Sequence, residues 1–195
     1  MRGRLWLHYF VSAVGEKDPT ERKAGPRQWT GFLGRIMDEV GKKMNCSVVR
    51  RRQEPEDKEL SGEYLNIDVV FIDNAEYDLN GEERKGDPFV LPRAVVELEN
   101  RYDPWKISYC LWKILCLRAP IRALVCLQES SDKVAALKQQ LENVIWQGSL
   151  TKGTDGDLFV IIGDESVGTE APWRDYFSVY EWRNDRLEKI EGLEW

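Results

Sequence analysis

Apolar residues recur along the chain with two different periods. Between residues 28 and 44 they fall three or four positions apart, which is the spacing of one face of an α-helix. These positions are Trp29, Leu33, Ile36, Val40 and Met44. In residues 64–73 and 89–100, apolar and polar residues alternate instead, which predicts strands. The chain therefore combines helices with strands.

Shorter patterns predict the remaining elements. Further strands are expected over 46–54, 121–128, 157–164 and 176–182. Further helices are expected over 104–118 and 131–147. Residues 15–27 are charged and rich in helix breakers, so they predict a loop after an N-terminal strand or short helix.

The order of these elements predicts a topology. The consecutive strands 46–54, 64–73 and 89–100 suit an antiparallel meander. The helix 104–118 is apolar nearly all round, so we expect it to be buried and to return strand 121–128 parallel to one of the three. We expect an α/β fold with a mixed central sheet flanked by helices. Because the 195 residues suit one hydrophobic core, we expect a single domain over 1–195.

Three glycines, Gly31, Gly34 and Gly41, share one face of the helix 28–44. Each costs helix stability of about 1 kcal/mol, which a close approach of another backbone could offset. A poorly optimised exposed face is the alternative.

The net charge of −6 and the pI near 5.1 lack the basic excess of proteins that hold nucleic acid by bulk charge. Binding of nucleic acid therefore needs a local patch. The best one is Arg50, Arg51 and Arg52, beside Lys42 and Lys43, for which phosphate contact and a plain solvated strand edge both stay open. The tryptophans could stack on bases, but their spacing places most of them in the core.

Several classes of site are excluded by composition. His8 is the only histidine, which excludes Ser-His-Asp and Cys-His sites within one chain. The four cysteines form no C-x-x-C pair, and no phosphate-binding glycine loop occurs. Three of the cysteines lie in apolar patterns typical of reduced thiols, which favours a cytoplasmic protein. No apolar run approaches the ~18 residues that span a bilayer.

Two glutamates stand one residue apart in an otherwise apolar strand. The Cα atoms of Glu97 and Glu99 would lie about 6.6 Å apart, and their charges would repel by roughly 2.5 kcal/mol at an effective dielectric constant of about 20. If Asp68 shares their face from a neighbouring strand, three carboxylates converge, and Mg²⁺ is the simplest partner. Alternatively, both glutamates lie on a solvated face and pair with Arg93, Arg101 or lysines.

These segments resemble a known family. The run Ile67-Asp68-Val69-Val70-Phe71 precedes Val96-Glu97-Leu98-Glu99, and a helix and another strand follow. This order resembles the core of the PD-(D/E)XK nuclease superfamily, the restriction-endonuclease-like αβββαβ fold, over about residues 28–128. The C-terminal part, 131–195, would be an elaboration of it.

The resemblance implies that Asp68 and Glu97 bind Mg²⁺ or Mn²⁺, and that the carbonyl of Leu98 completes the metal shell. The third motif position is commonly lysine but here is Glu99, as in a subgroup of restriction endonucleases that cleaves DNA. Family members sometimes move the lysine to the following helix, which makes Lys106 the first candidate and Lys113 the second. A lysine in a buried helix can also extend to the surface instead.

Members of the family also often place a glutamate of the first helix near the metal. Glu39 matches this position, with a solvated surface charge as the alternative. We therefore expect metal-dependent hydrolysis of nucleic-acid phosphodiesters, with Asp68, Glu97, Glu99 and Lys106 as catalytic candidates. The other hypothesis is a silent nuclease-like module that binds nucleic acid or protein. The expected partner is nucleic acid, DNA in the first place, with no membrane; a homodimer stays open.

Overall fold

The computed structural model describes residues 2–24, 26–50, 66–74, 91–148 and 156–195. Its helices are α1 (Arg2–Gly15), η1 (Pro19–Ala24, a 3₁₀ helix), α2 (Pro26–Met44), α3 (Pro104–Leu115), α4 (Ser131–Gly148) and α5 (Trp173–Tyr176). Its strands are β1 (Cys46–Arg50), β2 (Val69–Asp73), β3 (Ala94–Glu99), β4 (Ile121–Gln128), β5 (Asp157–Asp164), β6 (Phe177–Arg183) and β7 (Arg186–Lys189).

Within these ranges, seven strands form one sheet whose spatial order follows the chain, from β1 to β7. The first three strands pair antiparallel, as the predicted meander requires. β3, β4 and β5 then pair parallel, with α3 and α4 as the crossovers, and β6 and β7 return antiparallel. The predicted mixed sheet and the α/β class are therefore confirmed.

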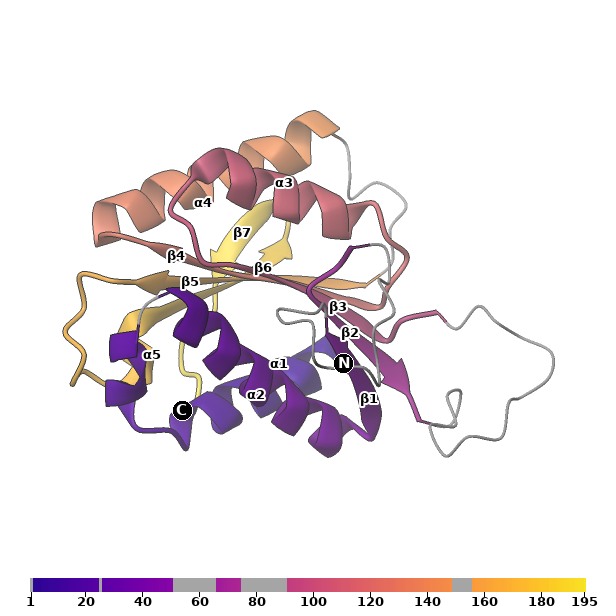
Figure 1. Cartoon of the computed structure of the whole chain (residues 1–195). Coiled ribbons are helices and arrows are strands. Elements are labelled where there is room, and N and C mark those ends of the chain that lie inside the picture. Colours follow the sequence, from indigo (N-terminus) through magenta and orange to yellow (C-terminus); the bar gives the residue numbers. More distant parts are fainter. Residues whose placement is uncertain (1, 25, 51–65, 75–90, 149–155) are drawn as a thin grey trace.

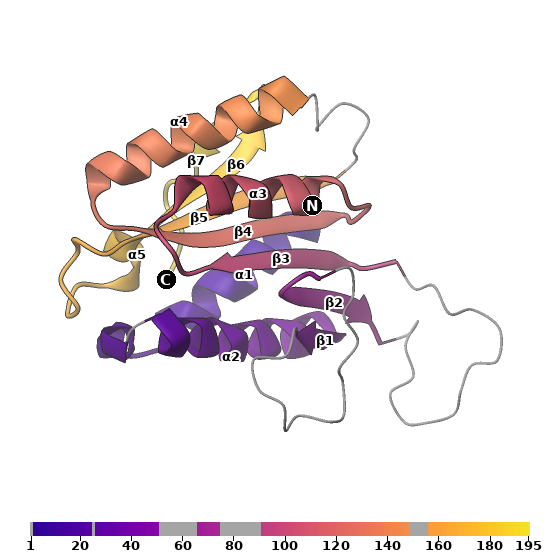
Figure 2. The same cartoon turned by 45° about the horizontal axis from the view of Figure 1, so that its top comes forward.

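The helices cover both faces of the sheet, with α1 and α2 on one side and α3 and α4 on the other (Figures 1 and 2). Alternate residues of each strand explain this division. Val96, Ala123 and Phe159 face the core under α1 and α2, whereas Val95 and Leu124 face the core under α3 and α4. None of the helices in the described ranges is long and apolar enough to cross a bilayer.

The N-terminal segment, expected as a strand or short helix, is the 14-residue helix α1. Trp6, Phe10 and Val14, spaced by four residues, are fully buried against the sheet. The ring of Trp6 stacks on Phe10 and on Phe159 of β5. The predicted loop 15–27 contains the short helix η1 and the first residues of α2.

Two of the three glycines of α2 lie where β1 approaches the helix. A Cβ at Gly41 would stand 2.2 Å from Cγ2 of Val48, and one at Gly34 would stand 2.6 Å from Nη1 of Arg50. A Cβ at Gly31 would meet no atom within 4 Å in the part of the chain that the structure describes. Close approach of β1, including the backbone oxygen of Cys46, therefore accounts for Gly41, whereas Gly34 meets only the flexible end of the Arg50 side chain and Gly31 is on an open face.

Helix α3 departs from the expectation that it is buried between two layers. Its residues Ile107, Leu111 and Ile114 are fully buried against the sheet, but Trp105 and Trp112 are exposed. The prediction failed because the helix has apolar side chains on nearly all of its sides, whereas the sheet and α4 cover only some of those sides. The helix also ends at Leu115 instead of residue 118.

The prediction that most tryptophans are buried succeeded for only some of them. Trp6, Trp29 and Trp173 are in the core, and Trp182 is partly buried. Trp105, Trp112 and Trp146 lie on the surface of α3 and α4. Helical spacing alone does not say which side of a helix a second layer covers.

Strand β2 begins later than expected. Asn66 has a left-handed backbone with φ of 59°, and regular pairing begins only at Val69. Consequently, Ile67 packs under α3 and α4 with Val70, and not on the face of Val69 as strict alternation predicts. Asp68 lies in this irregular entry to the strand, beside β3.

Candidate functional site

Asp68 and Glu97 lie side by side on neighbouring strands. β2 pairs with β3 so that Val69 stands opposite Val96, which brings the preceding Asp68 beside Glu97. The backbone N–H of Asp68 donates to Oε1 of Glu97 at 3.2 Å, and the N–H of Leu98 donates to Oδ2 of Asp68 at 3.0 Å. The backbone just before β2 thus orients the carboxylate of Glu97, and the backbone of β3 orients that of Asp68.

A lysine of α3 completes this group. α3 runs back along β3, and Nζ of Lys113 lies 2.8 Å from Oε1 of Glu97. The same ammonium donates to the carbonyl of Asn66 at 2.7 Å, which the left-handed turn at Asn66 places beside it. The side chain of Glu97 is 1% exposed and that of Lys113 is 15% exposed, so the pair is almost fully shielded from water.

Burial controls the charge of Glu97. Burial first, and the nearby charge of Asp68 second, raise the pKa of Glu97 to about 7, against the hydrogen bond and positive charge of Lys113. Burial also raises the pKa of the Cys110 thiol, which therefore stays protonated beside the same carboxylate. Near neutral pH, the carboxyl of Glu97 is therefore partly protonated, and its ionised form pairs with the ammonium of Lys113.

Glu99 shares the face of Glu97 but has a different environment. It is half-buried; its Oε1 accepts from the backbone N–H of Arg101 at 2.9 Å, and its Oε2 accepts from Sγ of Cys110 at 3.9 Å. In the described ranges, no three carboxylate, histidine or cysteine side chains form a group that could hold a metal ion. The structure thus brings together two of the expected carboxylates, and the third lies further along the strand.

The alternative of a solvated face does not apply to Glu97. Its side chain is enclosed, and its cationic partner comes from the covering helix. Arg93, one of the expected surface partners, instead pairs with Asp73 at 3.0 Å. Glu97 therefore belongs to an internal charged group under α3, and a plain exposed strand does not describe it.

The other candidates from the sequence lie elsewhere. Lys106, the first candidate for a lysine from the helix, is exposed, and Lys113, the second candidate, contacts Glu97. Glu39 pairs with Lys17 at 2.7 Å beside the α1 and α2 core, across the sheet from Glu97. The side chain of Leu98 also points into that core, while its backbone N–H binds Asp68.

Of the basic run, Arg50 pairs with Asp38 at 3.3 Å, and Arg51 and Arg52 lie outside the described residues. Sequence spacing ranked Lys106 above Lys113, whereas in the structure Lys113 is the lysine that contacts Glu97. The feature that selects Lys113 is the antiparallel path of α3 along β3. This path places the C-terminal end of the helix, and hence Lys113, over the middle of the strand.

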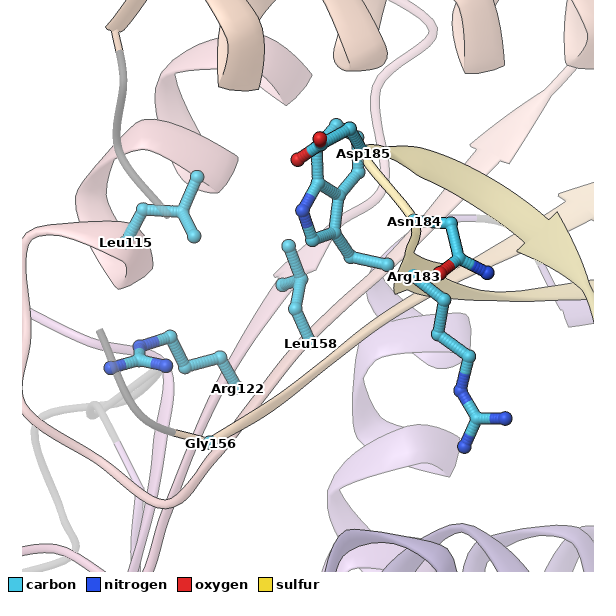
Figure 3. A pocket seen from close by; sticks show the side chains of 8 residues that line it. Leu115, Arg122, Gly156, Leu158, Arg183, Asn184 and Asp185 are labelled. Atoms are coloured by element: carbon cyan, nitrogen blue, oxygen red, sulfur yellow. The ribbon is translucent and has the colours of Figure 1, made fainter. Parts of the chain in front are cut away.

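A separate cavity of about 260 Å³ lies where α3 ends, near the start of β4 and β5 (Figure 3). Its lining residues are Leu115, Arg122, Gly156, Leu158, Trp182, Arg183, Asn184 and Asp185. Arg122 is buried and donates from Nε to the carbonyl of Leu117 at 3.1 Å. The side chain of Arg183 turns away from Arg122 (Figure 3) and pairs with Glu181 at 2.9 Å. No sequence pattern predicted this cavity.

The donor atoms beside Asp68 and Glu97 suit a hard divalent cation. Oδ2 of Asp68 and Oε1 of Glu97 accept backbone hydrogen bonds, and these two carboxylates are the groups that would hold such an ion. Carboxylate oxygens are the ligands that Mg²⁺ and Mn²⁺ prefer, so the donor chemistry fits such an ion.

No protein-family model matches the chain, and no curated protein matches it significantly in sequence.

Proposed function

We propose that the protein hydrolyses nucleic-acid phosphodiesters with the help of Mg²⁺ or Mn²⁺, at a site formed by Asp68, Glu97 and Lys113. The observation that carries this proposal is the contact of 2.8 Å between Lys113 and the buried Glu97, beside a second carboxylate. A buried acid with a strongly raised pKa, next to a lysine and another acid, is a common feature of catalytic sites. The order α2, β1, β2, β3, α3, β4 also supports a PD-(D/E)XK-like core.

In this proposal, Asp68 and Glu97 hold the cation, together with the carbonyl of Leu98. When bound, the ion supplies positive charge against the negative charge that develops on the phosphate oxygens. Ionised Glu97 is required for this, and the pKa near 7 means that cation binding displaces a proton from this carboxyl. The backbone N–H groups of Asp68 and Leu98 fix the orientation of the two carboxylates.

Lys113 replaces the lysine that the family commonly carries at the position of Glu99. Its ammonium has three donors, of which two are directed to Glu97 and to the carbonyl of Asn66. In the proposed reaction, the remaining donor orients the attacking water or a phosphate oxygen. Glu99, which is bound to the backbone of Arg101, has no direct part in this assignment.

The second candidate function is a catalytically silent nuclease-like module that binds nucleic acid or protein. The observation in its favour is that Lys113 already neutralises Glu97 within a closed ion pair. A lysine in this role would compete with a cation for the same carboxylate. The two functions differ in one measurable property, which is cleavage.

The test is cleavage of end-labelled DNA and RNA, single-stranded and duplex, by purified protein with Mn²⁺ or Mg²⁺. Glu97→Gln keeps the shape of the side chain but removes its charge, and Lys113→Met removes the ammonium. Each is expected to lower the rate by at least about 100-fold. Lys138→Met is the matched control, because Lys138 forms a 2.8 Å pair with Glu142 on the neighbouring helix α4; it should cleave at the wild-type rate.

Two further variants separate the candidate functions. Glu99→Lys restores the commoner residue of the family and should retain or raise the rate of a working site. Asp68→Ala should weaken Mn²⁺ binding in calorimetry, whereas equal binding, or none, in both proteins would contradict the metal site. If neither the wild type nor Glu99→Lys cleaves any substrate while both are folded, the silent module is the better description.

A further inference from the structure

Helix α3 presents three aromatic side chains on its outer surface. Trp105, Tyr109 and Trp112 are 83%, 57% and 46% exposed. Their spacing of four and three residues places them on one stripe of the helix. The rings of Tyr109 and Trp112 stack with their centroids 5.7 Å apart. Large aromatic side chains usually contribute their area to a core or an interface, so an exposed stripe of three indicates a binding surface.

The charge around this stripe is opposite to that of the whole chain. Residues 101–118 contain four basic residues, Arg101, Lys106, Lys113 and Arg118, and one acidic residue, Asp103, for a net charge of +3. The whole chain has a net charge of −6. The carboxylate of Asp103 is moreover engaged as the helix cap, where it accepts from the N–H of Trp105 at 3.0 Å. Lys113 is paired with Glu97, and the other charged residues of the segment still give a net charge of +2, so the aromatic stripe lies on a net-basic segment.

The stripe also leads to the candidate site. Trp112 directly precedes Lys113, and Tyr109 lies one helical turn before it, while the ammonium of Lys113 reaches Glu97 below the helix. α3 and α4 cover the same face of the sheet (Figure 2). A ligand bound along the stripe would thus reach the edge of the group formed by Asp68, Glu97 and Lys113.

We propose that the α3 stripe, Trp105, Tyr109 and Trp112, binds single-stranded nucleic acid by stacking on its bases, with Lys106 holding a backbone phosphate. Flat exposed rings interspersed with cations are the means by which proteins bind unpaired strands without sequence preference. Bases of a duplex are already stacked on each other, so the stripe selects unpaired segments. Single-stranded nucleic acid would then be the substrate class of the hydrolytic site. Its cleavage rests on the proposed function, whereas its binding to the stripe does not.

A second copy of the chain is the competing occupant of an aromatic surface. In a symmetric dimer, the same patch lies on both sides of the contact. Two net-basic segments would then face each other and repel, whereas a phosphate backbone supplies the complementary charge. The charge of the segment therefore favours nucleic acid over self-association.

The binding test uses fluorescence anisotropy of a short fluorescein-labelled oligothymidylate, with EDTA present so that no cleavage occurs. Trp105→Leu keeps an apolar side chain but removes the ring, and it should weaken binding about tenfold or more. Trp105→Phe keeps a stacking face and should stay within about threefold of the wild type. Trp146→Leu is the matched control, because Trp146 is an exposed tryptophan of α4, outside the stripe; it should bind like the wild type.

The phosphate contact has its own measurement. Lys106→Gln should lower the slope of log affinity against log salt concentration by about 0.7, the value for one phosphate contact with a single strand. A duplex of the same length should compete at least about tenfold less well than the unlabelled single strand.

Two binding outcomes would overturn the proposal: equal affinity of wild type and Trp105→Leu, or sedimentation showing a dimer that Trp105→Leu dissociates while no oligonucleotide binds. Failure of the proposed function looks different. In that case, the stripe binds single strands in EDTA with the expected loss in Trp105→Leu, but no substrate is cleaved with Mn²⁺. Cleavage of single strands that Trp105→Leu leaves unchanged would keep the hydrolytic site and reject the stripe.

Discussion

Each face of the sheet buries one glutamate under a helical layer, and the two glutamates are paired differently. Glu181 of β6 lies under α1, where Nη2 of Arg4 and Nη2 of Arg183 lie 2.8 Å and 2.9 Å from its carboxylate. Glu97 of β3 lies under α3 with one cation, Lys113, and with the like charge of Asp68 close by. Its two guanidinium partners leave no negative charge of Glu181 uncompensated. Glu97 has a single cationic partner, and burial and the charge of Asp68 raise its pKa to about 7.

The aromatic residues divide in the same way. The side covered by α1 and α2 buries its rings in a cluster that includes Trp6, Phe10 and Phe177, and the side covered by α3 exposes Trp105, Tyr109 and Trp112. One face is therefore a closed core, whereas the other combines a core with charged and aromatic groups near its surface. Function is expected where the layer is incompletely closed.

The largest expected effect comes from exchanging tryptophan for alanine on the two faces. Trp6→Ala removes a fully buried ring from the α1 core and should lower the free energy of unfolding by about 3–5 kcal/mol. Trp105→Ala removes an exposed ring from α3 and should change it by less than about 0.5 kcal/mol. Urea denaturation of both variants measures the difference. Similar losses in both would mean that the α3 stripe is part of a core.

The second effect concerns the ion pair under α3. Lys113→Met leaves Glu97 buried without its cation and should cost about 3 kcal/mol at about pH 8. At about pH 5.5 the cost should be much smaller, because Glu97 is then protonated in the folded protein. Arg183→Met is the matched control, because Glu181 keeps Arg4 and the loss should stay below about 1 kcal/mol. A cost for Lys113→Met that does not depend on pH would show that the charge of Glu97 is not the cause.

The raised pKa of Glu97 predicts how stability depends on pH in protein freed of metal by a chelator. Below about pH 4.5, Glu97 is protonated in the folded and the unfolded chain, so it contributes no slope. Between 4.5 and about 7, the unfolded chain releases this proton while the folded protein retains it, and above about 7 both states are ionised. The folded protein binds more protons in this window, so its stability falls as the pH rises.

The size of this fall is on the order of 3 kcal/mol for Glu97. Glu97→Gln cannot titrate at this position, so its stability should decline less over the same window. The measurement is a series of urea denaturation curves for both proteins from about pH 4 to pH 8. Parallel curves for the two proteins would mean that Glu97 titrates normally.

Local pattern predicted most of the fold. Strand alternation and helix spacing specified the elements, and a helix between two apolar strands required a parallel return. The pairing of Asp68 with Glu97 also followed from placing them on consecutive strands. These features depend on residues close in sequence or on a single reversal of the chain, so the hydrophobic pattern is enough to predict them.

Features that depend on the distance between layers were not predicted. The choice of Lys113 over Lys106 depends on the path of α3 over β3, and the exposure of Trp105 depends on how far the covering layer extends. The turn at Asn66, which shifts Ile67 to the other face, depends on a left-handed residue that strand alternation does not reveal. Each of these is decided by tertiary packing.

The smallest expected effect tests Glu39, the candidate that lies on the side of α1 and α2. Its carboxylate pairs with Lys17 at 2.7 Å, and both side chains are partly exposed. Because pairs of this kind contribute little, Glu39→Gln should cost less than about 1 kcal/mol. Calorimetry should also show Mn²⁺ binding like that of the wild type, whereas Glu97→Gln should lose it, since the sheet separates the two glutamates. Loss of Mn²⁺ binding in folded Glu39→Gln would contradict this division of the faces, and it would place α2 at the metal site.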